Sequence, residues 1–482
     1  MSLSLLLWSS AGVLGVVNGC GQEEDQATEQ LQLALIESTN ILDVRRSLAV
    51  TDVEILRRFT FKRVMDTLAS DANVRGLTGL GLFQQWWDTQ NRSPGSTDGP
   101  HCNQEVDANG RTLLNSFPYD CRPAPSEGAQ DACRSFDDPA CAYIPIGLFN
   151  RFDLAPDDAA HCGEHRIVFA KMSGTTTPRD RNLVIFEAVV KNPFPRLGEQ
   201  GCRRLIEAWA ELSFIASPER RADRLERMYF RGGSGFPPVI SWQNLGDNPN
   251  GWGQIRTNQF MVVGLPSIWT LREFKLVRAC ERRAGCRAQF VPVTAKNNPI
   301  GLLFGDPAAD PRVAAFQQQL VRDNLEPLTA TAVADIGMST PDTFNSGQSH
   351  SSGSSELDYA TPFATQREGF RQEIWRALGE LGSGITPEQL VTRARTQTCA
   401  GCHQLSNNQE LGDGLVWPPS LGFVHVSEVM PETVDGAERY RISALLTSSF
   451  LPARSRLMFD FLKERPWRRR GIWWTWGGRF TH

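Results

Sequence analysis

Two short stretches of this sequence combine side chains that can hold a metal or a cofactor. The first is Cys399-Ala-Gly-Cys402-His403, in which two thiols stand three residues apart and an imidazole follows at once. Each thiol can form a thioether with a haem vinyl group, and the imidazole can then bind the iron as its proximal ligand. The spacing therefore predicts haem c, covalently attached through Cys399 and Cys402, with His403 bound to the iron.

The second stretch, His161-Cys162-Gly163-Glu164-His165, matches the H-x-x-E-H pattern of a class of zinc hydrolases. That chemistry needs both imidazoles on one face of a stable helix, with the glutamate as general base. Here a glycine interrupts the motif, a turn around Pro156 precedes it, and the strand-like Arg166-Ile-Val-Phe-Ala follows it. These surroundings favour a loop that enters a strand, so zinc hydrolysis at this motif is the weaker alternative.

The residues ahead of Cys399 predict the helix that positions it. Thr386 is suited to the N-cap, Pro387 to the first helical position, and Gln389 to the third position of a capping box. Leu390, Val391 and Ala394 continue the pattern as far as the motif. An earlier amphipathic helix is expected over residues 370–381.

A glycine-rich stretch follows the motif, and after it come Pro419-Ser420-Leu421-Gly422 and then Met430-Pro431. With the CxxCH, these features resemble class I c-type cytochromes. The resemblance implies a mainly α module over residues 360–466, with a last helix at 454–465. It also implies that the Pro-x-Leu-Gly segment places a backbone carbonyl against the second ring nitrogen of His403.

The same resemblance implies a methionine as the sixth iron ligand, and Met430 is the candidate. It follows His403 by only 27 residues (430 − 403), a shorter spacing than is usual in the family. His425 competes for the position, and a five-coordinate iron is the third possibility. A His/Met pair would raise the potential relative to a His/His pair.

The N-terminus predicts export. Residues 3–17 are apolar but too short to span a bilayer comfortably, and polar, acidic residues follow them. The ending Val17-Asn18-Gly19-Cys20 resembles a bacterial lipobox, which implies a lipid on Cys20. No Lys or Arg precedes the apolar run, so the start codon could lie further upstream. We expect a periplasmic or outer-membrane-associated lipoprotein, anchored to the membrane through this lipid.

The cysteine count agrees with export. Of eleven cysteines, one is assigned to lipid and two to haem, which leaves an even number. Eight cysteines can form four disulfides in an oxidising compartment, with the pairing left open except that the last two are close enough for a local loop. The disulfide candidates are Cys102, Cys121, Cys133, Cys141, Cys162, Cys202, Cys280 and Cys286.

Composition and patterning predict an α+β protein of several parts. With a net charge of −4 and no basic stripe through the body, nucleic acid is not an expected partner. The expected parts are a signal peptide (1–19), a tether (20–27), a helical region (28–90), a disulfide-stapled α+β body (91–345), a Ser/Gly linker (346–359), the haem module (360–466) and a basic, Trp-rich tail (467–482).

The sequence therefore predicts an exported c-type haem protein that passes single electrons to a redox partner. The ligand of the α+β body stays open, as does whether the protein is an enzyme. The main alternative is an exported, disulfide-rich binding or structural lipoprotein in which Cys399 and Cys402 form a disulfide and hold no iron.

Overall fold

The computed structural model describes residues 42–122, 134–138, 142–246, 251–260, 268–282, 285–351, 355–365 and 369–464. The predictions for the signal peptide, Cys20, the tether, the C-terminal tail, Cys133 and Cys141 lie outside these residues. The described residues from Asp43 onward belong to one compact unit. They combine helices with antiparallel sheets, which confirms the α+β class. Within them, no helix is both long and apolar enough to cross a bilayer.

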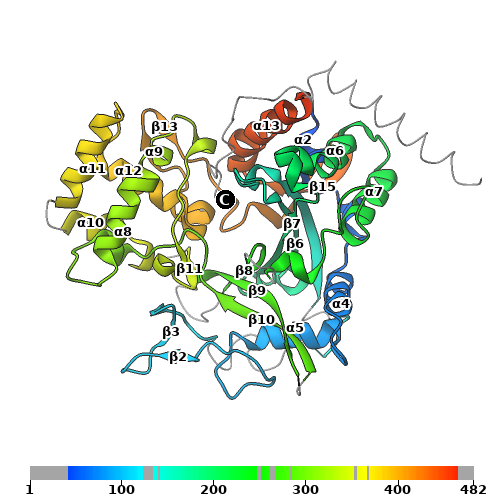
Figure 1. Cartoon of the computed structure of the whole chain (residues 1–482). Coiled ribbons are helices and arrows are strands. Elements are labelled where there is room, and N and C mark those ends of the chain that lie inside the picture. The colour runs from blue at the N-terminus through cyan, green and yellow to red at the C-terminus, as the bar shows by residue number, and fades with distance from the viewer. Residues whose placement is uncertain are drawn as a thin grey trace, which may run out of the picture. The chain divides into compact units, whose positions relative to one another are not determined.

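An antiparallel sheet of eight strands forms the centre of this unit (Figure 1). The strand order is β1-β5-β6-β7-β8-β9-β10, and β11 also pairs with β9. The strands are β1 (Ala49–Val50), β5 (Tyr143–Arg151), β6 (His161–Lys171), β7 (Asn182–Lys191), β8 (Gln254–Phe260), β9 (Trp269–Glu281), β10 (Gly285–Val293) and β11 (Gln348–His350).

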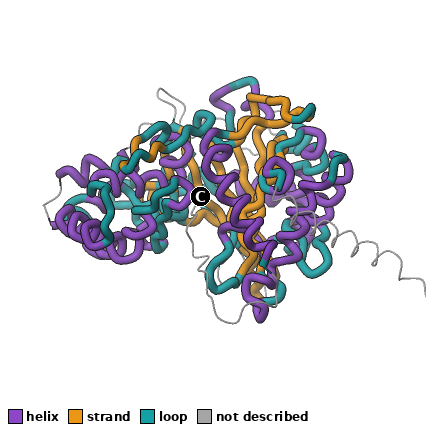
Figure 2. The backbone as a smooth tube through the Cα atoms, turned by 90° about the horizontal axis from the view of Figure 1, so that it is seen from above, coloured by secondary structure: helices purple, strands orange, loops and turns teal. Residues whose placement is uncertain are grey.

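Successive side chains along β6 and β7 point alternately to the two faces of the sheet. Phe169 on β6 and Phe186 on β7 contact the ring of Phe61, which begins α4 (Phe61–Asp71). Because successive side chains of a strand point to opposite faces, Val168 and Ile185 belong to the other face. Both of these side chains line a cavity there. Figure 2 shows helices on both sides of the strands.

The described part of the predicted helical region, residues 42–90, is mainly helical. The helical region contains α2 (Val44–Ser47), α3 (Val53–Leu56), α4 and α5 (Gly79–Asp88). In the body, β2 (Glu105–Val106), β3 (Thr112–Leu114) and β4 (Phe117–Pro118) form a small sheet, and α6 (Arg203–Glu211), α7 (Pro218–Phe230), α8 (Val313–Gln319) and α9 (Leu325–Leu328) follow. Ser217 caps α7, since its hydroxyl accepts the N–H of Arg220.

The C-terminal region contains helices and two short hairpins. Its elements are α10 (Ala360–Thr365), α11 (Gly369–Glu380), α12 (Pro387–Thr396), β12 (Glu410–Gly412), β13 (Leu415–Val416), β14 (Val426–Val434), β15 (Ala437–Ile442) and α13 (Leu451–Lys463). The predicted capping box of α12 is confirmed: the hydroxyl of Thr386 accepts the N–H of Gln389, whose side chain accepts the N–H of Thr386. In Figure 1, α8 to α12 gather at one side of the sheet and α6 and α7 at the other.

The linker prediction is wrong for residues 346–351. These residues are buried, and β11 pairs with β9 so that His350 lies opposite Thr270. A Cβ on Gly347 would lie 2.8 Å from the Tyr119 ring, so only glycine fits there without a shift. Small residues are also what a close approach between two segments requires, and composition alone cannot distinguish that situation from a solvated linker.

Three of the expected disulfides are present among the described residues: Cys102–Cys121, Cys162–Cys202 and the local pair Cys280–Cys286. The first fixes the chain beside Asp120. The second ties β6 to the beginning of α6. Six of the eight predicted cysteines are thus paired, and the two assigned to haem are not.

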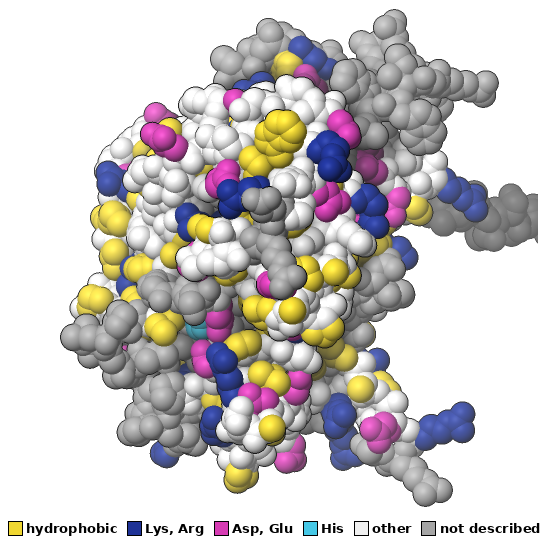
Figure 3. Space-filling view, turned by 90° about the vertical axis from the view of Figure 1, so that its left-hand side faces the viewer, with side chains coloured by type: hydrophobic (Ala, Val, Ile, Leu, Met, Phe, Trp, Pro, Cys, Tyr) yellow, Lys and Arg dark blue, Asp and Glu magenta, His cyan; other side chains and the backbone are white. Residues whose placement is uncertain are grey.

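Figure 3 shows the molecule from the left-hand side of Figure 1. On this face basic and acidic side chains are interspersed, with hydrophobic side chains scattered among them. One small area of histidine surface is visible there, with acidic side chains beside it.

Candidate functional site

The chain turns sharply between α12 and the CxxCH motif. The helix buries Leu390, Val391 and Ala394, and it ends at Thr396. A Cβ on Gly401 would lie 1.8 Å from the carbonyl oxygen of Arg395, so the residue at position 401 must lack a side chain. This close packing explains the glycine inside Cys-Ala-Gly-Cys-His and fixes where the two thiols point.

Cys399 and Cys402 are both buried, and neither forms a disulfide. Burial raises the pKa of Cys399 to about 11 and that of Cys402 to about 12, so both are neutral thiols at pH 7. The sulfur of Cys402 lies 3.4 Å from Nε2 of His425. Because disulfide exchange needs a thiolate, buried neutral thiols are poorly suited to it.

His403 has the protonation and orientation that a metal-binding imidazole needs. Its Nδ1 lies 2.7 Å from the carbonyl oxygen of Phe423, so Nδ1 carries the proton and donates it to that oxygen. Burial lowers the pKa of the ring to about 4, which keeps it neutral at pH 7. The lone pair is therefore on Nε2, and a carbonyl behind a ligating histidine is the usual support for such a ligand.

The carbonyl comes from Phe423, one residue beyond the segment from which the resemblance implied it. Phe423 adopts a positive φ of 70°, and its ring stacks on Trp269 of β9 with centroids 5.3 Å apart. The amide of Asn258 on β8 donates to the same carbonyl at 2.7 Å. The central sheet therefore holds in place the atom that orients His403.

The motif opens into a cavity between the sheet and the C-terminal region. Its empty volume is about 840 Å³, including solvent at the mouth. The wall on the sheet side is largely apolar and comes from β5, β6 and β7: Phe149, Val168, Leu183 and Ile185. The opposite wall contains both thiols and the imidazoles of His403 and His425, together with Val426, Leu446 and Phe450.

A set of cationic side chains also lines this cavity: Arg151, Arg166, Arg256, Lys296 and Arg454. Four buried carboxylates pair with them, namely Asp153, Glu164, Glu187 and Glu273. Five cations against four carboxylates leave an excess of one positive charge, and Lys296 is the most exposed of the five cations. Burial, with a smaller contribution from the neighbouring Arg151, lowers the pKa of Arg454 to about 9.

The two sixth-ligand candidates lie in different places. The ring of His425 packs directly against that of His403, with centroids 4.4 Å apart. Two imidazoles that bind one metal from opposite sides have their nitrogens about 4 Å apart, and their ring centres are farther apart still. Met430 lies within β14, half-exposed, and is not part of the cavity wall. In this arrangement neither side chain is positioned opposite His403.

The side chains of the H-x-x-E-H motif contact other parts of the folded chain. The whole motif lies within β6, which begins at His161, whereas the sequence predicted a loop that enters a strand after His165; as predicted, it is not on a helix. Cys162 is joined to Cys202. Nδ1 of His165 accepts a hydrogen bond from the indole N–H of Trp209 at 3.1 Å. Glu164 forms a buried ion pair with Arg166 at 2.6 Å. The motif's ionisable groups are therefore engaged in packing the sheet.

The described residues can also be searched for side chains that already lie close enough together to share one metal ion. Among the described residues, three or more His, Cys, Asp or Glu ligand atoms lie within 4.8 Å of one another only at Asp120, His350 and Glu356. The thiols and imidazoles near Cys399 do not converge in this way, which argues against a Cys/His zinc centre there. Sequence reasoning missed both this triad and the basic cavity wall, because their members are far apart in the chain.

Comparison with known proteins finds no match: no family model, no curated protein sequence and no solved structure matches the chain. The function is therefore argued from the geometry of the site.

Proposed function

We propose that this chain is an exported c-type haem protein that transfers single electrons, with Cys399 and Cys402 as covalent anchors and His403 as the proximal iron ligand. The observation that carries the proposal is the environment of His403. Its Nδ1 proton is held by the Phe423 carbonyl, its ring is neutral, and both free thiols line the same cavity. A haem bound there would supply one-electron iron chemistry.

The other residues of the cavity suit such a group. The apolar side chains of β5 to β7 and of the facing wall exclude water from a flat hydrophobic ligand. The surplus of cations offers a partner for carboxylates such as haem propionates. Asn258, by sharing the Phe423 carbonyl, tunes how strongly His403 is polarised. Met430 and His425 stay candidates for the sixth ligand, and either would have to move relative to His403.

Location and partners follow from the same proposal. The three disulfides are compatible with an oxidising compartment, as expected for a lipoprotein anchored through Cys20. The electron would pass to a redox partner protein. The haem-free alternative needs a Cys399–Cys402 disulfide, whereas both residues are thiols here.

The deciding experiment is a haem stain on a denaturing gel with a pyridine haemochrome spectrum. The protein would be produced with its export signal and a periplasmic cytochrome-maturation system. We expect about one covalent haem per chain, complete loss in Cys399→Ala/Cys402→Ala, and retention in the matched control Cys280→Ala/Cys286→Ala, which removes a surface disulfide.

A colourless wild-type protein would overturn the proposal and favour the haem-free lipoprotein. If haem is present, absorption spectra of Met430→Ala and His425→Ala identify the sixth ligand. A change in only one of the two variants assigns the position, and no change in either indicates a five-coordinate iron.

A further inference from the structure

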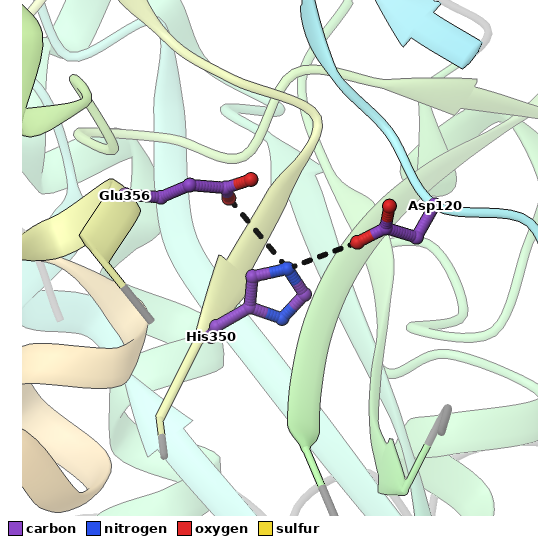
Figure 4. A group of neighbouring side chains, drawn as sticks. All are labelled: Asp120, His350 and Glu356. Carbon is purple, nitrogen blue, oxygen red and sulfur yellow. Dashed lines mark ion pairs between the residues drawn. The ribbon is translucent and has the colours of Figure 1, made fainter. Parts of the chain in front are cut away.

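A second site of potential chemistry lies away from the cavity, where three segments meet (Figure 4). Asp120 follows β4, His350 ends β11, and Glu356 lies in the short helix Ser355–Leu357. Nε2 of His350 is 3.3 Å from Oδ2 of Asp120 and 3.6 Å from Oε2 of Glu356. Figure 4 shows the imidazole between the two carboxylates, with the same ring nitrogen facing both.

Neighbouring side chains hold His350 and Asp120 in this orientation. The hydroxyl of Thr270 lies 3.0 Å from Nδ1 of His350, which leaves Nε2 for the carboxylates. Gln348, two residues before His350, donates to Oδ2 of Asp120 at 3.0 Å and accepts that residue's backbone N–H at 2.8 Å. The disulfide of Cys121 fixes the chain immediately after Asp120. The ligand atoms thus have supporting hydrogen bonds of the kind found behind metal ligands.

The charge of the cluster favours a cation. His350 and Glu356 are largely buried, with 4% and 15% of their side chains exposed, whereas Asp120 is 46% exposed. The nearby guanidinium of Arg111 is 3.8 Å from the other oxygen of Glu356 and is mostly exposed. Two carboxylates at one imidazole therefore lie in a place where an added positive charge would reduce the cost of burial.

We propose that Asp120, His350 and Glu356 bind a divalent transition-metal ion, with zinc as the best match. One imidazole nitrogen and two carboxylate oxygens are a donor set that zinc accepts, whereas calcium and magnesium prefer oxygen alone. Three protein ligands leave a position open for water, as in zinc sites that bind a further ligand. The exposed side of Asp120 provides the entry path.

The position of the site gives the ion a structural consequence as well. The ion would join the loop after β4 to β11 and to the segment that leads into α10. Two of its ligands, Asp120 and His350, are 230 residues apart in the chain (350 − 120). An ion that binds the folded state only would stabilise that state according to its concentration relative to Kd.

The test is zinc binding to the full-length chain after removal of metal with a chelator, measured by calorimetry and by metal content. We expect about one zinc per chain, with affinity reduced more than tenfold in His350→Gln and in Asp120→Asn. Thr270→Val, which removes only the support of His350, should weaken binding about tenfold. His161→Gln is the matched control and should bind zinc like the wild type.

Two results would overturn the proposal: a wild-type chain that binds no zinc, or zinc binding that His350→Gln and Asp120→Asn leave unchanged. X-ray absorption at the zinc edge adds an independent readout, with only nitrogen and oxygen ligands expected. Sulfur ligands would assign the zinc to Cys399 and Cys402 instead. Because Asp120 is half-exposed, Asp120→Asn keeps the test valid if His350→Gln fails to fold. None of these measurements depends on haem.

Discussion

The two motifs that stand out in the sequence, Cys399–His403 and His161–His165, have opposite surroundings in the structure. The side chains of the first open into a cavity, and a backbone carbonyl orients His403. Those of the second are engaged in a disulfide, an indole hydrogen bond and buried ion pairs. The difference teaches that a motif indicates chemistry only where the fold leaves its reactive atoms facing a space that a ligand can enter.

The largest expected effect compares the two cysteine pairs in protein made without haem. Cys162→Ala/Cys202→Ala removes a crosslink that spans 40 residues, a loop whose closure is worth about 4 kcal/mol. Cys399→Ala/Cys402→Ala removes the same atoms without breaking a crosslink. In urea unfolding we expect the first pair to lower the free energy of unfolding by about 4 kcal/mol more than the second. Equal losses would contradict the structural role assigned to Cys162.

A smaller effect concerns the pH dependence of stability at His165. Burial lowers its pKa to about 3 in the folded state, from the ordinary value of 6.5. The unfolded chain therefore takes up the proton first, and stability falls as the pH drops from about 6.5 towards 3. Between pH 7 and pH 5, protonation of His165 in the unfolded chain should lower the free energy of unfolding by about 2 kcal/mol.

The measurement is urea unfolding at pH 8, 7 and 5 for the wild type and for His165→Gln. The decrease in the free energy of unfolding between pH 7 and pH 5 should be about 2 kcal/mol smaller in the variant than in the wild type. The drop between pH 8 and pH 7 should be small in both proteins and serves as the internal reference. An identical acid response in the two proteins would show that His165 is not buried in its neutral form.

The smallest effect tests the support of His403 and rests on the proposed haem. Asn258→Ala removes a second hydrogen-bond donor from the Phe423 carbonyl. The hydrogen bond from Nδ1–H of His403 to that carbonyl should then strengthen, which makes the imidazole a better electron donor to iron. We expect the midpoint potential to become more negative, by an amount on the order of tens of millivolts.

Asn182→Ala is the matched control for that change. It removes a buried amide on β7 that bonds Gln259 and does not contact the carbonyl of Phe423. Both variants should lose about 1 kcal/mol of unfolding free energy. A shift in potential of the same size in both would mean that Asn258 acts through general loosening of the sheet.

Local features of the fold were predictable because neighbouring residues cause them. The capping box at Thr386 and the loop closed by Cys280 and Cys286 each depend on residues a few positions apart. The prediction failed at residues 346–351, where the same small residues serve a linker or a tightly packed strand equally well.

The sequence by itself carries the proposal of haem attachment at Cys399, Cys402 and His403, because that chemistry needs only side chains at a fixed local spacing. Only the tertiary structure decided that the Phe423 carbonyl orients His403, that β5 to β7 cover the cavity, and that His350 meets Asp120. These contacts join segments far apart in the chain, such as Asp120 and His350, and they depend on which faces of the sheet and helices pack together. No local pattern encodes that choice, since the same strand can present either face to the same partner.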